Sequence, residues 1–317
     1  MIELARERGK PLPAWERDDL EGYMVASDTK SLREYLARFD VIIPLLQDAQ
    51  AIERVAYELA EDNASENVRY LEVRFCPGLN TKEGLTSALV IEAALRGLAQ
   101  GMEDFRIRIG LIVCGLRHLE PRASAILAEV ATSFKGKGVV GFDLAGAESG
   151  HPPMEHRAAF QTAAQANMAI TIHAGEDQGP ESIRQALHDC GAHRIGHGTR
   201  LFRDADLLRY VKDFRVPLEV CLTSNVQTGA VASYREHPLR AYYEEGLVVT
   251  LNTDNRLVSG TTLTEEYWKA HHHLGFTWSE LQEVAVMGFR CAFMPRDEKL
   301  ALLDQVRREM GELDAKG

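Results

Sequence analysis

The segment Met168-Ala-Ile-Thr-Ile-His-Ala-Gly-Glu176 decides the fold class of this chain. It opens with a short apolar run, typical of a buried strand, and places a histidine directly after that run and a glutamate three residues later. In barrels and open sheets built from alternating strands and helices, the carboxyl ends of the strands face the active site. The segment therefore predicts a strand that carries His173 and Glu176 to a functional edge.

Two further segments are organised in the same way. Arg194-Ile-Gly-His-Gly198 places His197 between two glycines, and Val248-Val-Thr-Leu-Asn-Thr-Asp-Asn255 is an apolar strand that ends in Asp254 and Asn255. Three strand ends would thus bring a His with a Glu, a second His, and an Asp to one rim. This combination is typical of a metal-dependent hydrolase.

Runs rich in Val, Ile and Leu alternate with amphipathic stretches of helical length along the chain. They are typical of a parallel α/β sheet covered on both faces, so they predict a doubly wound sheet or a (β/α)8 barrel. We expect seven strands, at residues 69–75, 106–113, 138–144, 169–173, 193–196, 217–222 and 246–252. Helices are expected at 2–9, 84–101, 122–133, 180–189, 204–214, 279–293 and 296–310. A closed barrel has eight strands, so a missing strand would belong before the opening helix.

The composition, with 45% hydrophobic residues and no low-complexity linker, predicts one globular domain over residues 1–317. A formal net charge of −11 argues against nucleic acid or an anionic membrane as a partner and favours a small neutral or cationic ligand. No apolar run is long enough for a transmembrane helix, and the first residues lack the apolar core of a secretory signal. The five cysteines form no CxxC pair, so we expect a cytoplasmic protein with reduced thiols.

His173 and Glu176 each allow a structural and a chemical interpretation. His173 could be a core histidine bonded to a backbone carbonyl, but its place at a strand end beside Gly175 favours a metal ligand, and imidazole suits Zn²⁺. Glu176 could stabilise the start of the helix expected near Pro180, or it could be a buried general acid or base. The sequence leaves these two interpretations of Glu176 evenly balanced.

The other two strand ends carry similar alternatives. His197 could only line a turn, but its flanking glycines favour close approach to a ligand and a role in orienting a metal-bound water. Asp254 could cap the next helix, but the polar cluster around it favours a ligand carboxylate. Asn255 is then expected to bind substrate through its amide.

Two other polar groups are given structural roles. Glu72 and Arg74 alternate with apolar neighbours in the first expected strand, which predicts a buried ion pair. The run His271-His-His273 lies in an expected helix, where consecutive side chains point in different directions and cannot bind one metal together. We expect a solvated helix face there.

Six motifs, in this order along nearly the whole chain, carry a resemblance to a known family. They are Tyr70-Leu-Glu-Val-Arg-Phe-Cys-Pro77, Val139-Val-Gly-Phe-Asp-Leu-Ala-Gly146, Thr171-Ile-His-Ala-Gly-Glu176, Arg194-Ile-Gly-His-Gly198, Cys221-Leu-Thr-Ser-Asn225 and Leu251-Asn-Thr-Asp254. Their joint occurrence resembles the adenosine deaminases of the amidohydrolase superfamily. The resemblance implies a (β/α)8 barrel with one zinc ion at its carboxyl face, acting in purine metabolism.

The resemblance also implies a role for each matched residue. His173 and Asp254 correspond to zinc ligands, Glu176 to the residue that exchanges a proton with N1 of the purine, and His197 to the histidine that positions the zinc hydroxide. Gly146 corresponds to a backbone contact with the purine, and Asp143 lies in the same strand-end motif; with Asn255 these two form the predicted substrate-binding set.

Two departures from the family pattern stand out. The family's first strand carries a His-x-His pair of zinc ligands, whereas this chain has no histidine before His118 and opens in the helix that would follow that strand. We therefore expect a shortened chain or a misplaced start codon, with a weak zinc site and open sheet edges at residues 69–75 and 246–252. The second departure is Asn255, where many family members have a second Asp.

These observations leave three functional hypotheses. The first is deamination of adenosine and deoxyadenosine to the inosine products in purine salvage. The second is a related deaminase of adenine or of a modified adenosine. The third is a non-catalytic barrel that binds purine nucleosides, which the absent His-x-His pair supports and which should purify without stoichiometric zinc.

Overall fold

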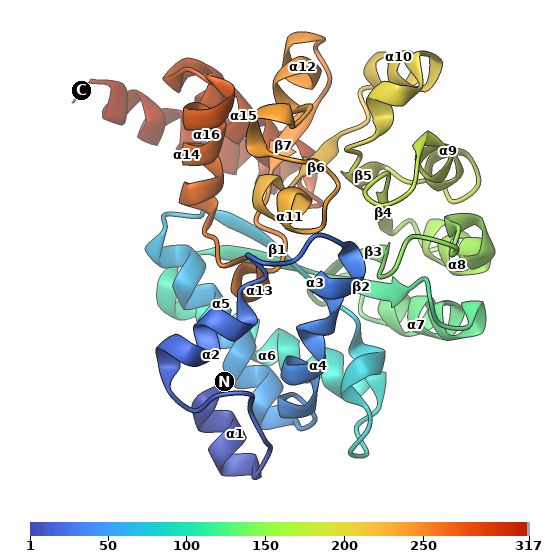
Figure 1. The fold of residues 1–317 in the computed structure, drawn as a ribbon, viewed down its shortest axis with the longest axis vertical. Coiled ribbons are helices and arrows are strands. Elements are labelled where there is room, and N and C mark those ends of the chain that lie inside the picture. Colours follow the sequence, from blue (N-terminus) through green and yellow to red (C-terminus); the bar gives the residue numbers. More distant parts are fainter. Residues whose placement is uncertain (316–317) are drawn as a thin grey trace.

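Seven parallel strands form one curled sheet in the computed structural model, which describes residues 1–315 (Figure 1). The strands are β1 (Tyr70–Phe75), β2 (Arg108–Leu116), β3 (Val139–Ala145), β4 (Ala169–Ala174), β5 (Arg194–His197), β6 (Leu218–Val220) and β7 (Val249–Leu251). Their order in the sheet is the order in the sequence, and every neighbouring pair is parallel. The predicted barrel-type fold with seven strands is therefore confirmed.

The sheet does not close on itself. Within residues 1–315, β1 pairs only with β2, and β7 pairs only with β6. The two edges that the sequence predicts to be open are thus the edges of the observed sheet. They face each other across a cavity that is lined by residues of both strands, such as Val73 and Leu251.

Two predicted strands are shorter in the structure. The sixth ends at Val220 because Leu222 already begins helix α11. The seventh begins at Val249 rather than Gly246, because the N–H of Leu247 bonds to the carbonyl of Tyr242 at the end of the preceding helix. The last two strands are therefore the shortest elements of the sheet.

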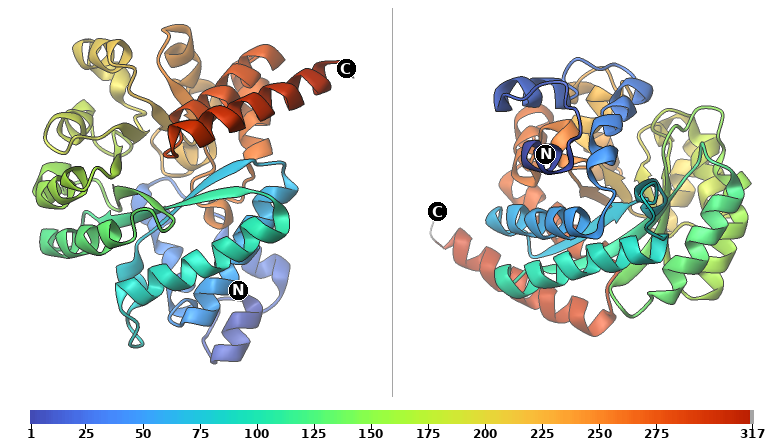
Figure 2. Two further views of the ribbon diagram at one scale, coloured as in Figure 1. Left: turned by 180° about the vertical axis from the view of Figure 1, so that it is seen from behind. Right: turned by 90° about the horizontal axis from the view of Figure 1, so that it is seen from below.

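Most of the helices form an outer layer around the strands, as the two views in Figure 2 show. The helices in the first half of the chain are α1 (Ile2–Arg8), α2 (Arg17–Met24), α3 (Leu32–Ala37), α4 (Phe39–Ile42), α5 (Ala49–Ser65), α6 (Ser87–Phe105), α7 (Pro121–Ser133) and α8 (Arg157–Gln165). In the second half they are α9 (Pro180–His188), α10 (Ala205–Asp213), α11 (Leu222–Gln227), α12 (Leu239–Glu244), α13 (Arg256–Ser259), α14 (Leu263–Leu274), α15 (Trp278–Cys291) and α16 (Arg296–Asp314). Short 3-10 turns lie at Ile43–Leu45, Pro77–Asn80, Pro153–His156, Leu201–Arg203 and Tyr234–Glu236.

Local sequence signals explain several helix boundaries. Capping boxes begin α14 at Thr262 and α15 at Thr277, because each threonine hydroxyl and the glutamate three residues later satisfy otherwise unpaired N–H groups. Proline occupies the first helical position of α9, where its missing N–H costs nothing. None of the helices in residues 1–315 combines the length and hydrophobicity that a membrane crossing requires.

The N-terminal helices cover part of the carboxyl end of the sheet. Leu20, Met24 and Tyr35 form a small apolar cluster with Val258 of α13, which follows β7. The hydroxyl of Tyr35 also lies 2.8 Å from Oγ of Ser259. The N-terminal segment is thereby fixed next to the strand ends that the sequence predicts to be functional.

Candidate active site

One cavity of about 2120 Å³ runs between the two open edges of the sheet, from Arg69 and Tyr70 at the start of β1 to the carboxyl ends of the strands. It is lined by six of the seven predicted site residues, namely Gly146, His173, Glu176, His197, Asp254 and Asn255. The seventh, Asp143, has no exposed surface and does not line the cavity. The structure thus brings four of the seven strand ends to a single space.

The register of β4 and β5 places the two histidines side by side. His173 pairs with Gly196, and Ala174 pairs with His197, so the two imidazole centroids lie 5.1 Å apart. A Cβ at position 196 would come within 3.1 Å of the His173 Cα and 3.3 Å of its ring. Gly196 is therefore the residue that lets the His173 side chain lie against β5.

The backbone at His197 and Asp254 is in the left-handed region, with φ of 63° and 55°. Four other non-glycine residues share this conformation, and all four are at the C-terminal ends of helices, where it is an ordinary way to stop a helix: Asn67, Arg106, Asn167 and Arg215. His197 is instead the last residue of β5, Asp254 follows β7, and both line the cavity. Unusual backbone conformations of this kind concentrate at functional sites.

A buried carboxylate organises the loop after β4. The two oxygens of Glu148 accept hydrogen bonds from four successive backbone N–H groups, those of residues 175–178, at 2.6–3.0 Å. They also accept a bond from the hydroxyl of Ser182 at 2.6 Å, and Arg117 lies 3.7 Å away. Burial alone would raise the pKa of Glu148, but Arg117 and these donors lower it, so the group is a carboxylate. The loop that carries Glu176 is thus wrapped around a fixed negative charge.

A second buried carboxylate orients His173. Asp143 of β3 lies 3.0 Å from Nδ1 of His173, and Arg117 donates a hydrogen bond to the His173 carbonyl. Burial would raise the pKa of Asp143, but His173 and Arg74 beside it hold it well below its ordinary value. Because Nδ1 is engaged by Asp143, Nε2 is the nitrogen of His173 left for a ligand in the cavity.

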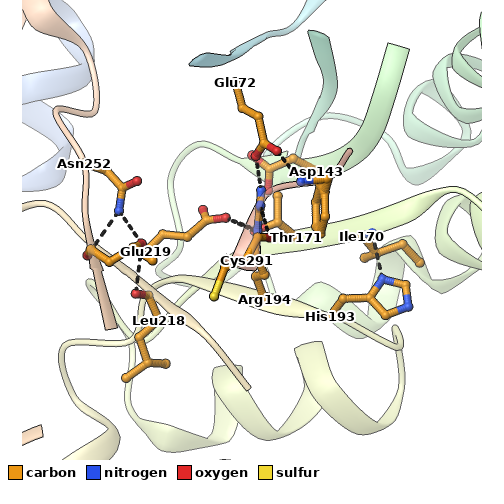
Figure 3. A network of polar contacts seen from close by, with 12 residues as sticks. Glu72, Asp143, Ile170, Thr171, His193, Arg194, Leu218, Glu219, Asn252 and Cys291 are labelled. Atoms are coloured by element: carbon orange, nitrogen blue, oxygen red, sulfur yellow. Dashed lines mark hydrogen bonds and ion pairs between the residues drawn. The ribbon is translucent and has the colours of Figure 1, made fainter. Parts of the chain in front are cut away.

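Asp143 is also one end of a chain of ion pairs that crosses the interior of the sheet. Arg194 lies between Glu72 and Glu219, 2.6 Å from each, as Figure 3 shows. Glu219 in turn lies 2.6 Å from Arg74, which lies 3.1 Å from Asp143. Ion pairs therefore connect strands that are far apart in the sequence, directly below His173.

The ion pairs differ from the expected pairing of Glu72 with Arg74, and they account for the low pKa of Glu219. Glu72 and Arg74 are in ion pairs as predicted, but with partners on other strands rather than with each other. This follows from the barrel geometry, since side chains on one face of a curled sheet converge with those of the opposite strands. Burial would raise the pKa of Glu219, but Arg74 and Arg194 lower it to about 2.

Glu176 is nearly enclosed and only partly paired. Its side chain is buried, and its Oε2 lies 3.5 Å from Nε2 of His197. Its Oε1 has no hydrogen-bond partner within residues 1–315. Burial raises the pKa of Glu176 above its ordinary value, a condition that suits proton transfer near neutral pH.

Asp254 and Asn255, which follow β7, have different roles. Oδ2 of Asp254 accepts a hydrogen bond of 2.7 Å from Ser224. The cap of helix α13 is Asn255, whose Oδ1 accepts from the N–H of Val258 at 2.8 Å. The capping role considered for Asp254 is therefore filled by its neighbour, which leaves the carboxylate of Asp254 facing the cavity.

The three consecutive histidines lie apart from the cavity, on α14. His271 and His272 are exposed, and His272 stacks on Trp268 with 4.7 Å between ring centroids. The run thus lies on a solvated helix face, as predicted.

Comparison with known proteins decides the family. The family model described as adenosine deaminase matches residues 1–309. The chain belongs to the adenosine deaminase family. An adenosine deaminase of Mycobacteroides abscessus is 42% identical over 96% of this chain and 89% of its own length. Among solved structures, an adenine deaminase from Arthrobacter aurescens has a TM-score of 0.89 at 27% identity, covering 98% of this chain and 93% of that one. Arabidopsis ADAL in complex with IMP has a TM-score of 0.85 at 29% identity, covering 98% and 92%.

Membership in the family makes this protein a hydrolytic deaminase and raises the question of its metal. A catalytic zinc site in a protein has three protein ligands and one open position. Within residues 1–315, no cluster of three or more His, Cys, Asp or Glu side chains could hold a metal ion. The donor set of this deaminase therefore fits zinc in part: His173 and Asp254 have the right chemistry, and the described residues provide no third ligand.

Sequence reasoning missed three buried residues that support the site of this deaminase. Glu148 holds the loop after β4, and Asn225 and His237 lie behind His197. Glu148 is three residues after the end of β3, in a segment without hydrophobic periodicity. Asn225 belongs to one of the quoted family motifs, so its position was visible in the sequence although its contact was not.

Proposed function

We propose that this deaminase hydrolyses adenosine and deoxyadenosine to inosine and deoxyinosine. The observation that carries the proposal is Glu176: a buried carboxyl with a raised pKa and one unpartnered oxygen, in the cavity that His173, His197 and Asp254 also line. The 42% identity to an adenosine deaminase over most of both chains supports the choice of substrate.

The reaction adds water across the bond between C6 and N1 of the purine and then expels ammonia. Glu176, as the protonated carboxyl, gives its proton to N1, so that C6 becomes the electrophile. The oxygen of water forms the new bond to C6. One proton of the water replaces the proton that Glu176 gave to N1, and the other goes to the amino group. The C6–N bond to the amino group then breaks, and the amino nitrogen leaves as ammonia. His197 lies 3.5 Å from Glu176 and holds the attacking oxygen in place.

His173 and Asp254 are the residues that would hold a zinc ion. Such an ion lowers the pKa of bound water to about 7 and so supplies hydroxide at neutral pH. The protein's own contribution is to fix the donor atoms. Asp143 directs Nε2 of His173 away from β3, and Ser224 fixes one oxygen of Asp254.

The purine is expected to lie against Gly146 and Asn255. Gly146 follows β3 with φ of 96°, and a Cβ there would come within 2.7 Å of the His118 ring, so only glycine leaves its backbone open. The capping bond of Asn255 uses Oδ1, which leaves Nδ2 to donate to a ring nitrogen. Asp143, also predicted in the substrate-binding set, would act through His173.

The main alternative within the family is a different purine. An adenine deaminase and a protein bound to IMP are among the similar folds, at 27% and 29% identity. Adenine lacks the ribose, and a nucleotide adds a phosphate, so kcat/KM for adenosine, deoxyadenosine, adenine and AMP separates the possibilities. We expect adenosine and deoxyadenosine to lead by at least tenfold.

The deciding experiment is ammonia release from adenosine by the purified chain with added zinc, with bound zinc measured in parallel. Ammonia release that Glu176→Gln abolishes is the expected result. Zinc bound without ammonia from adenosine or deoxyadenosine would contradict the proposal. If adenine alone were turned over, the proposed deamination would stand, but adenine rather than adenosine would be the substrate.

A further inference from the structure

The feature that the proposed function leaves unused is a buried polar chain behind His197. Asn225 has no exposed surface and His237 is 4% exposed, and hydrogen bonds join the two side chains to one another, to His197 and to the N–H of Leu239. Buried polar groups that form such a chain cost free energy unless every donor meets an acceptor. The direction of each bond is therefore determined.

This series of hydrogen bonds begins at a backbone N–H, which can only donate. The backbone N–H of Leu239 donates to Nδ1 of His237 at 3.0 Å, so Nδ1 carries a lone pair. Burial lowers the pKa of His237 to about 3, which makes the ring neutral at physiological pH. A neutral imidazole with an accepting Nδ1 carries its proton on Nε2.

The next two bonds follow from the first. Nε2 of His237 lies 3.1 Å from Oδ1 of Asn225, so the ring donates and the amide oxygen accepts. This leaves the NH₂ group of Asn225 facing Nδ1 of His197 at 2.9 Å. Because an amide NH₂ can only donate, Nδ1 of His197 must accept.

We propose that His237 and Asn225 are positioning residues that hold His197 as the tautomer with its proton on Nε2. That proton then faces the cavity and Oε2 of Glu176, 3.5 Å away. His197 in this state donates a hydrogen bond to an oxygen in the cavity and has no free lone pair with which to remove a proton. Under the proposed function, on which this role rests, His197 binds the attacking oxygen as a donor and is not the base.

The tautomer can be measured without any turnover. Long-range proton–nitrogen correlation spectra of the ¹⁵N-histidine-labelled protein distinguish protonated from unprotonated ring nitrogens, and His197→Gln assigns the signals. We expect an unprotonated Nδ1 and a protonated Nε2 in His197 at neutral pH. A protonated Nδ1 in the wild-type protein would overturn the proposal, whether or not the enzyme turns over adenosine.

The variant Asn225→Asp should reverse the direction of the hydrogen bond between residue 225 and Nδ1 of His197. A carboxylate accepts from both rings, so His197 should gain a proton on Nδ1, and kcat should fall about 100-fold with KM nearly unchanged. Asn167→Asp is the matched control, because it makes the same change on an exposed residue at the end of α8. An unaltered His197 spectrum in folded Asn225→Asp would refute the role.

Two substitutions of His237 separate positioning from packing. His237→Gln keeps an N–H donor toward Asn225, whereas His237→Leu fills the space without one. We expect His197 to keep its proton on Nε2 in the first variant and to show a mixture of tautomers in the second. Identical His197 spectra in both variants would show that the hydrogen bonds from His237 through Asn225 do not set the tautomer of His197.

Discussion

The ends of β4 and β7 both deliver a charged group to the cavity, but they are supported very differently. His173 at the end of β4 is bonded by Asp143 and by Arg117, and the loop after it is wrapped around Glu148. Within residues 1–315, the carboxylate of Asp254 beyond β7 accepts a hydrogen bond from Ser224 alone, and the residue follows a strand of three residues at the sheet edge. The chemical groups on the central strands are thus fixed by the protein itself, whereas the edge depends more on what binds there.

The strongest test of the central strands is Glu176→Gln. The amide cannot give a proton to the purine, so turnover should fall by about 10³-fold or more while bound zinc stays unchanged. Steady-state kinetics and metal analysis on the same sample check this. The matched control is Glu181→Gln on α9, an exposed residue, which should keep full activity. If Glu176→Gln were as active as the wild type, Glu176 would not be the residue that gives the proton.

Removing the oriented ligand tests whether the metal depends on β4. His173→Ala deletes the imidazole that Asp143 orients, so the zinc content of the protein purified with added zinc should fall from the wild-type level to near zero. His272→Ala, on the exposed face of α14, should change nothing. If His173→Ala retained as much zinc as the wild type, the residue would not be a ligand.

The support of the loop can be weakened without touching the reacting groups. Glu148→Gln replaces an acceptor by an NH₂ that opposes the backbone N–H groups of residues 175–178, so Glu176 should move out of place. We expect kcat to fall by about 10- to 100-fold, in line with the cost of losing groups that orient a site. Ser182→Ala removes only one of the five bonds and should cost less. An equal loss in both variants would mean that the loop does not depend on the carboxylate.

The ion pairs below β4 can be tested through stability rather than activity. Glu219 has its pKa lowered from an ordinary value of 4.5 to about 2, so it binds a proton more readily in the unfolded chain. Its contribution to stability, on the order of 3 kcal/mol, is therefore complete above pH 4.5 and lost as the pH falls toward 2. Urea unfolding between pH 7 and 3 should show a shallower pH dependence for Glu219→Gln than for the wild type. The exposed Glu120→Gln should keep the wild-type slope.

The sequence predicts the central strands well because their signal is local. The apolar run before His173 and the glycine at 196 determine a buried strand and its close neighbour, and both lie where they were expected. The supports of the site are not local: Glu148 bonds to a loop about 30 residues further on, and His237 acts on a histidine 40 residues before it through Asn225. Such contacts arise only once the sheet has brought the strand ends together, so no pattern along the chain predicts them.

The left-handed backbone at His197 and Asp254 has a consequence for the engineering of this protein. A non-glycine residue in that region costs roughly 1–2 kcal/mol, which glycine would recover. At Asp254, whose side chain is exposed, glycine should therefore raise the melting temperature and, under the proposed function, remove the activity. At His197 the gain is outweighed, because glycine would leave a cavity and the buried NH₂ of Asn225 without its acceptor. Natural proteins often give up stability for activity in this way. A screen of variants for heat resistance alone would thus select against Asp254, a residue that the proposed reaction needs.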